Sequence, residues 1–271
     1  MVRIGIALLV LALASGCASS PTGRSQLLLY SDNQLAEMGA ASFAEQKRDV
    51  PLTKDASTNE YVRCIADAIL AHVDPKTVPG EAGPWEVVVF SSDQANAFAL
   101  PGRKIGVYTG LLGVAKNESQ LAAVVGHEVG HVLARHGNER ISQSSLTQLT
   151  QSAVAATVAS RDMSTATGQA IMAGLGLGAQ YGVMLPYSRA QETEADTIGL
   201  KLMARAGFDP RESVKLWENM AKAAGGAAPP ELLSTHPSNQ SRIANLQSHM
   251  QEAVAIEAEA SQARGRPACG R

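Results

Sequence analysis

Aromatic residues and net charge are both scarce in this sequence, and each scarcity narrows the class of protein. Only 4% of the 271 residues are aromatic, although 45% are hydrophobic. Much of the apolar fraction is therefore alanine, which favours helices over a β-sandwich or a β-barrel. The net charge of −2 and the pI near 6.3 give no sign of a nucleic-acid-binding surface. The length is typical of one domain with tails, and no internal repeat is visible.

A long hydrophobic run is also missing, because the most apolar stretch, residues 4–13, is far too short to span a bilayer as a mature helix. This stretch ends in Leu-Ala-Ser-Gly-Cys at 13–17, which resembles a bacterial lipobox. We therefore expect a lipoprotein signal peptide over 1–16 and lipidation of Cys17; an ordinary signal peptide cut nearby is the alternative. No aspartate follows the cysteine, which resembles sorting to the outer membrane, with the protein anchored by lipid and facing the periplasm.

Cysteine is limited to three residues, of which Cys64 and Cys269 remain after the lipidation site. The periplasm permits disulfides, so these two residues could pair. The sequence does not place their Cα atoms within bonding reach, so a disulfide and two free thiols both stay open.

The composition divides the chain into a folded part with two tails. Residues 17–30 are rich in Ser, Pro, Thr and Gly, which predicts a tether from the lipid. We expect one folded domain over 31–252. From about residue 253 to 271 the chain is rich in Ala, Glu, Gln and Arg, which predicts a frayed, disordered tail.

The strongest motif is His-Glu-Val-Gly-His, on a predicted helix over 118–136 that ends at Gly137. Histidines at i and i+4, here His127 and His131, lie on one helix face and can bind one zinc ion. Glu128 is one residue further on, so it lies beside the metal and can act as the catalytic base toward water. Two surface histidines on an ordinary helix are the alternative, but this helix has an apolar face.

A third ligand is expected in Ser-Arg-Ala-Gln-Glu-Thr-Glu-Ala-Asp at 188–196, about sixty residues further on. Glu192 and Asp196 are spaced i and i+4, so both can point at the same place. We assign Glu192 to zinc, and Asp196 to the free N–H of a ligating histidine; the reverse assignment stays open. Glu194 is rotated by about 200° on a helix and should face away. A solvated acidic helix face is the alternative.

Together these motifs resemble the HtpX and prenyl-protease family of gluzincin metallopeptidases, in particular its BepA/LoiP-like periplasmic and Oma-type branches. The resemblance covers roughly residues 30–250. It implies an α+β fold: a mainly helical, zincin-like metalloprotease domain with a small sheet whose edge strand borders the active-site cleft. The matching segments are Asn-Ala-Phe-Ala-Leu-Pro-Gly at 96–102 with Tyr-Thr-Gly-Leu at 108–111, the motif at 127–131, the segment at 192–196, and Ser-Thr-His-Pro at 234–237 followed by Arg242.

The resemblance also implies a function, a zinc-dependent metalloendopeptidase with one Zn²⁺ per chain that cuts unfolded or misassembled envelope proteins. Asn96 and Ala97 would lie on the edge strand, where a substrate peptide adds as an extra strand; a plain turn role for Asn96 stays open. His236 could fill the open coordination site or stabilise the oxyanion, or it could merely pack beside proline. Arg242 is a weaker candidate for the same oxyanion or cleft role.

A second class of function is a chaperone-like outer-membrane assembly factor with a latent zinc site. The expected partners are protein or peptide substrates, the membrane through a lipid anchor, and outer-membrane assembly machinery, with no nucleic acid. Three further histidines have no place in these motifs. His72 and His249 are expected at the surface, and His136 is expected to interact with the dipole at a helix C-terminus.

Overall fold

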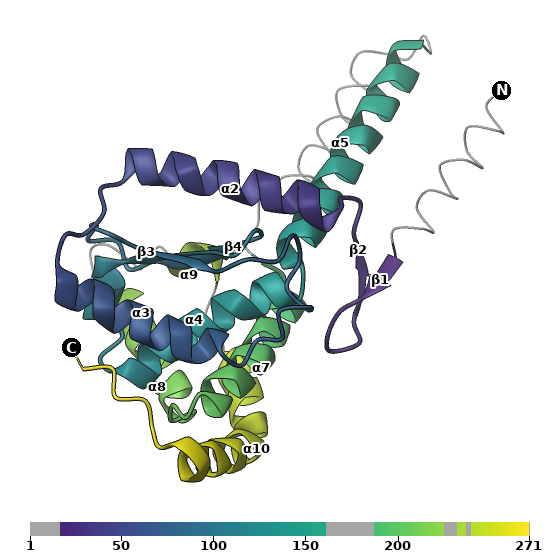
Figure 1. Ribbon diagram of the computed structural model, residues 1–271. Helices are drawn as coiled ribbons and strands as arrows, with labels where there is room; N and C mark the ends of the chain where they lie inside the picture. Colours follow the sequence, from purple (N-terminus) through teal and green to yellow (C-terminus); the bar gives the residue numbers. More distant parts are fainter. Residues whose placement is uncertain (1–16, 161–186, 225–231, 237–239, 271) are drawn as a thin grey trace.

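A three-stranded sheet lies between one helix on its outer face and several helices on its inner face (Figure 1). The computed structural model describes residues 17–160, 187–224, 232–236 and 240–270; the expected signal peptide lies outside them. The mainly helical α+β class is confirmed. The elements are β1 (Cys17–Ser19), β2 (Ser25–Leu27), α2 (Asp32–Asp49), α3 (Ala56–Leu70), β3 (Glu86–Phe90), β4 (Ala97–Leu100), β5 (Lys104–Tyr108), the 3-10 helix η1 (Thr109–Gly113), α4 (Glu118–Leu133), α5 (His136–Ser160), α7 (Arg189–Arg205), α8 (Glu212–Ala224), α9 (Leu232–Thr235) and α10 (Gln240–Arg264).

The sheet has the order β3-β5-β4, with β3 parallel and β4 antiparallel to the central strand β5. Strand β4 is therefore an edge strand, in agreement with the edge strand that the family resemblance implied. Helix α2 covers the outer face through aromatic packing. The Phe43 ring meets Phe90 and Phe98 edge-on, with centroid distances of 6.2 and 6.0 Å.

The inner face of the sheet packs on α3 and on the almost completely buried helix α4. Helix α4 in turn packs against α7 at very short range, because small residues face each other. A Cβ atom added to Gly130 would stand 2.8 Å from the carbonyl oxygen of Ala195, and one added to Gly199 would stand 2.6 Å from the backbone nitrogen of His127. The glycines therefore allow the two helices that carry the predicted metal ligands to approach each other closely.

The end of α4 differs from the expected helix over 118–136. Helix α4 ends at Leu133, and α5 begins three residues later at His136. Arg135 between them adopts the left-handed conformation with φ of 55°, so the chain turns here and not at Gly137. The Arg135 guanidinium donates to both carboxylate oxygens of Asp32 at 3.1 and 2.8 Å, which ties this turn to α2.

The expected tether over 17–30 is instead a docked β-hairpin with a following segment. Strands β1 and β2 pair antiparallel, and the chain after them is hydrogen-bonded along α5. Leu29 N donates to Ser142 Oγ at 2.8 Å, and Asn138 Nδ2 donates to the Tyr30 carbonyl at 2.7 Å. On the N-terminal side these contacts use the backbone of Leu29 and Tyr30, which the side-chain composition of the segment does not reveal.

The expected disordered tail over 253–271 is also wrong for most of its length. Helix α10 runs without a break to Arg264 and buries Ala253 and Ala260. Alanine and glutamate are good helix formers, and the small side chains permit close packing. Beyond the helix, Cys269 forms a disulfide with Cys64 on α3, with a Cα–Cα distance of 5.7 Å. Within the described ranges, no helix combines the length and the apolar character that crossing a bilayer requires.

Candidate metal centre

Four buried side chains from three parts of the fold converge on one point. His127 and His131 come from α4, Glu192 from the first turn of α7, and His236 follows α9. One potential ligand atom from each residue lies within 4.8 Å of the others. The Nε2 atoms of His127 and His131 are 3.0 Å apart, and Glu192 Oε1 is 3.4 Å from His131 Nε2.

Local sequence signals place these side chains. The Asn117 side chain accepts from Gln120 N at the start of α4, and the Ser188–Gln191 capping box starts α7. With both starts fixed, the i and i+4 spacing directs the two histidines to one face of α4. The capping box places Glu192 in the first turn of α7, where a carboxylate is favoured by the helix dipole.

The donor set fits a zinc ion. Two imidazole nitrogens and one carboxylate oxygen are the protein ligands of a common type of catalytic zinc site. Glu128, next to the first histidine, is buried, and its Oε1 has no hydrogen-bond partner among the described residues. Burial is the main influence on this carboxyl and raises its pKa. An unsatisfied buried carboxyl beside three convergent donors is expected where a reacting group or ligand binds.

The first histidine contacts Asp196, the residue for which the sequence suggested a contact with a ligating histidine. His127 Nδ1 lies 2.9 Å from Asp196 Oδ1, which leaves Nε2 to face the other donors. Burial and the charge of Arg242 lower the pKa of His127. Hydrogen bonds with Asp196 and Glu192 outweigh both and raise it to about 9. Asp196 therefore holds the ring as a carboxylate partner does in many metal sites.

Arg242 differs from its expected role in the cleft. Its side chain is only 1% exposed and lies behind the ligands, with Nη1 2.6 Å from Glu192 Oε2. It also donates to both oxygens of Asp196 and stacks on Trp217, with Cζ 3.8 Å from the ring centroid. This residue holds the two carboxylates of the site, and an oxyanion role for it stays a prediction.

The second histidine is oriented by two residues for which the sequence predicted other roles. His131 Nδ1 lies 2.8 Å from Nδ1 of His136, and His136 Nε2 lies 3.0 Å from Glu194 Oε2. His136 is fully buried and begins α5, so it does not lie at a helix C-terminus as expected. Glu194 does face away from the ligands, as expected, but it is buried against His136 and the N-terminal hairpin. Burial lowers the pKa of His131 far below its usual value, so the ring is neutral.

The sequence expectation for the edge strand holds for β4 but not for Asn96. Hydrogen-bonded pairs alternate along an antiparallel ladder, and Tyr108 N donates to Asn96 O. The backbone groups of Ala97 and Ala99 therefore face away from β5, and the Ala99 backbone opposes the burial that raises the pKa of Glu128. The Asn96 side chain lines a separate polar cavity with Gln46 and Tyr108 on the α2 side of the sheet.

Comparison with known proteins identifies the family. The model of peptidase family M48 matches residues 56–250, which include all the converging donors. The chain belongs to this family. The family expected from the sequence is thereby confirmed, and the buried donor group agrees with the zinc dependence of M48 peptidases.

Several relatives carry related names. The chain is 39% identical over 170 residues to mitochondrial metalloendopeptidase OMA1 of Schizosaccharomyces pombe, covering 62% of this chain and 48% of that protein. It is 34% identical over 249 residues to metalloendopeptidase OMA1 of Danio rerio, covering 88% and 51%. It is 29% identical over 225 residues to the β-barrel assembly-enhancing protease of Escherichia coli K12, covering 82% and 45%. The chain thus spans about half the length of the curated relatives it matches.

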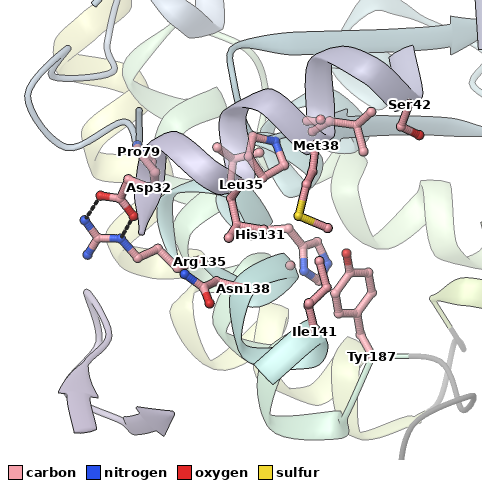
Figure 2. Close-up of a pocket in the computed structure, with 16 residues that line it drawn as sticks. Asp32, Leu35, Met38, Ser42, Pro79, His131, Arg135, Asn138, Ile141 and Tyr187 are labelled. Atoms are coloured by element: carbon pink, nitrogen blue, oxygen red, sulfur yellow. Dashed lines mark hydrogen bonds and ion pairs between the residues drawn. The ribbon is translucent and has the colours of Figure 1, made fainter. Parts of the chain in front are cut away.

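An apolar cavity of about 300 Å³ adjoins the M48 metal centre (Figure 2). One wall is the His131 ring with Tyr187, whose ring centroids lie 4.1 Å apart, and the opposite wall is α2 with Leu35 and Met38. Figure 2 shows the Met38 and Tyr187 side chains directed toward the same space beside His131. Helix α2 lies outside the residues matched by the family model. Tyr187 could not be singled out from the sequence, because a lone tyrosine before a helix belongs to no motif.

Proposed function

We propose that this chain is a zinc-dependent metalloendopeptidase that cuts internal peptide bonds. The observation that carries the proposal is the convergence of His127, His131 and Glu192 beside the buried carboxyl of Glu128. The three residues would hold the ion, and Glu128, rotated by about 100° from His127 on the helix, would lie beside the ion and not among its ligands. Membership of the M48 family and the names of its relatives support this reading.

The proposed reaction adds water to a scissile amide and yields a carboxylate and an amine. When bound, zinc supplies a Lewis acid that activates water and polarises the amide carbonyl. Glu128 takes a proton from the attacking water and passes it to the leaving nitrogen. Burial raises the pKa of Glu128, which favours its holding the proton between the two transfers.

His236 supports a closed arrangement of this site. Its Nδ1 lies 3.0 Å from Glu192 Oε1 and 3.3 Å from His127 Nε2, so it is placed as a fourth donor. Its short helix α9 is held at the start of the edge strand, where Leu232 N donates to the Ala95 carbonyl at 3.2 Å. A fourth protein ligand removes the open position that a catalytic zinc needs. We therefore propose that the site is latent in this arrangement and that α9 moves before substrate binds.

The proposed substrate is an extended segment with a large apolar side chain. An extended peptide can pair with the open edge of β4, where the backbone of Ala97 faces away from β5. The apolar cavity beside His131 would then receive the side chain next to the scissile bond. Such a segment is exposed in unfolded or misassembled proteins. We propose envelope proteins as the substrates. Lipidation of Cys17 would anchor the protein at the outer membrane and so bring the site within reach of them. The name of the E. coli relative refers to β-barrel assembly.

The decisive experiment measures zinc and proteolysis together. The purified wild-type protein should bind one zinc ion and cut an unfolded protein such as casein, and Glu128→Gln should keep the zinc while losing about 10²–10⁴-fold in rate. Glu37→Gln on the exposed face of α2 is the matched control and should leave both properties unchanged. Absence of bound zinc in the wild type, or normal proteolysis by Glu128→Gln, would refute the proposal.

A further inference from the structure

We infer that the N-terminal hairpin contributes to metal binding, because it holds the ligand His131 in its binding orientation through Glu194 and His136. The inference rests on the proposed metal site and adds a set of positioning residues to it. Strands β1 and β2 form this hairpin, which Figure 1 shows beside the start of α5. The hairpin lies outside residues 56–250, so the family match does not include it.

A chain of hydrogen bonds connects His131 through His136 to Glu194. For Nε2 to offer its lone pair to a metal, the proton of this neutral ring must sit on Nδ1. Nδ1 can then donate to His136 Nδ1 at 2.8 Å, and His136 Nε2 donates to Glu194 Oε2 at 3.0 Å. An ionised carboxylate only accepts hydrogen bonds, so Glu194 fixes the direction of the whole chain.

Two residues of the hairpin hold Glu194 by hydrogen bonds. Thr22 Oγ1 donates to Glu194 Oε1 at 2.6 Å, and Arg24 Nε donates to Glu194 Oε2 at 3.0 Å. The same guanidinium donates twice to Glu139 on α5, at 2.7 Å each, and Glu139 also accepts from Gln191 on α7. Arg24 therefore joins three elements, and Glu194 cannot move without breaking charged, buried hydrogen bonds.

The hairpin itself is fixed in place by its own turn and by a contact with the turn between α4 and α5. Gly23 N donates to the Ser20 carbonyl at 2.9 Å, with Gly23 at a φ of 88° that a glycine adopts freely. The amide of the buried Gln26, in the orientation that satisfies both of its ends, donates to the carbonyl of Ala134 at 3.0 Å. Ala134 lies in the turn between α4 and α5, so the hairpin is bound to the chain that links His131 to His136.

The two histidine ligands therefore differ in their support. His127 is oriented by Asp196, which lies in the matched family region, whereas the support of His131 passes through two residues, His136 and Glu194, and ends on the N-terminal hairpin. Loss of a partner that orients a ligand typically costs about 10–100-fold in metal affinity. Contacts on the hairpin should therefore change zinc affinity although they do not touch the metal.

The test measures zinc affinity of the full chain by competition with a chromogenic chelator. Thr22→Val removes the hydroxyl that donates to Glu194 and contacts Ser20, at nearly constant shape, and Arg24→Met removes the charged contacts. We expect the zinc Kd to rise several-fold in the first variant and about 10–100-fold in the second, with partial recovery in Arg24→Lys. Arg48→Met, which removes an exposed arginine from α2, should leave the Kd unchanged. Circular dichroism of the metal-free proteins checks that each variant is folded.

Double variants separate a positioning role from general destabilisation. Thr22→Val and His136→Phe act on one chain of contacts, so the double variant should bind zinc no more weakly than His136→Phe alone. Thr22→Val and Asp196→Asn act on different ligands, so their fold-changes should multiply. If folded Arg24→Met and Thr22→Val bind zinc as the wild type does, the hairpin inference is wrong and the metal site stands. If Arg24→Met does not fold, Thr22→Val and its double variants decide. A wild type without zinc overturns both proposals.

Discussion

Arg242 donates two parallel hydrogen bonds to Asp196, with Nε 2.7 Å from Oδ2 and Nη2 2.6 Å from Oδ1. Its third nitrogen, Nη1, lies 2.6 Å from Glu192 Oε2, so one guanidinium holds both carboxylates near the metal centre. The cost of desolvating buried charges offsets much of their attraction, so such a cluster adds little net stability. Its value lies in geometry, since it aims one carboxylate at the metal position and the other at His127.

Removing this guanidinium should be costly, because two buried carboxylates lose their partner. We expect Arg242→Met to destabilise the metal-free protein by about 3–5 kcal/mol in urea unfolding. The double variant Arg242→Met with Asp196→Asn should recover part of the loss, since one uncompensated charge is removed as well. Arg242→Lys should recover little, because a single ammonium cannot form the parallel pair. An unfolding free energy of Arg242→Met within about 1 kcal/mol of the wild-type value would contradict this role of Arg242.

The short approach of α4 and α7 predicts a strong effect of one methyl group. Gly199→Ala places a Cβ atom 2.6 Å from the backbone nitrogen of His127, so one helix must shift. We expect a loss of about 1–3 kcal/mol in unfolding free energy, against the gain that alanine normally brings to a helix, together with weaker zinc binding. Gly113→Ala is the control, because a Cβ atom there meets nothing within 4 Å. Equal behaviour of the two variants would show that the helices can yield.

The ligands were predictable from sequence because helical spacing fixes them locally. His127 and His131 lie one turn apart, and Glu192 and Asp196 repeat that spacing, so each pair needs only its own helix to share a face. Bringing the two pairs together is a tertiary event, for which the sequence offered only the order of the motifs. The structure supplies the reason in the small residues at the α4–α7 contact, such as Gly130.

The support of His131 was not predictable in the same way. It depends on the left-handed conformation of Arg135, an unusual choice for a residue with a side chain, which ends α4 early and turns His136 back toward the site. It depends also on the hairpin contacts of Thr22 and Arg24 with Glu194, more than 160 residues away along the chain. Composition suggested a linker there, because the polar residues that bind another element and those that face water look alike in sequence.

The disulfide between Cys64 and Cys269 should contribute to stability, since it ties the chain end to α3 across 205 residues of sequence. Closing so long a loop restricts the unfolded chain, and replacing both cysteines by serine should cost about 2–5 kcal/mol. Thermal unfolding with and without reductant measures the effect. Alkylation before and after reduction, followed by mass spectrometry, tests the bond itself. A protein that takes up two alkyl groups on Cys64 and Cys269 without reduction would contradict it.

The charge of Glu194 should make the unfolding free energy depend on pH. Hydrogen bonds from His136, Thr22 and Arg24 outweigh burial and lower its pKa below the ordinary 4.5. A carboxyl whose pKa is lower in the folded state contributes stability above pH 4.5 and loses it as pH falls from there through the folded value. The difference in unfolding free energy between metal-free wild type and Glu194→Gln should therefore be largest at neutral pH and shrink below pH 4.5. A difference that stays constant from pH 7 to 3 would show that the charge has no role.

The apolar cavity should set which side chain is accepted next to the cut bond. Asp32 and Arg135 at its rim neutralise each other, and Met38 is 46% exposed, so its replacement should not disturb the core. In a peptide series that varies one position, the wild type should prefer large apolar residues, with each methylene changing kcat/KM by about 10-fold or more. Met38→Lys should lower kcat/KM for apolar peptides and raise it for acidic ones. Met38→Glu should also lower kcat/KM for apolar peptides, but it should raise it for basic ones. Leu149→Lys, an exposed position on α5 outside the cavity lining, is the control. If the charged variants keep the preference of the wild type at every position of the series, the cavity does not receive the substrate.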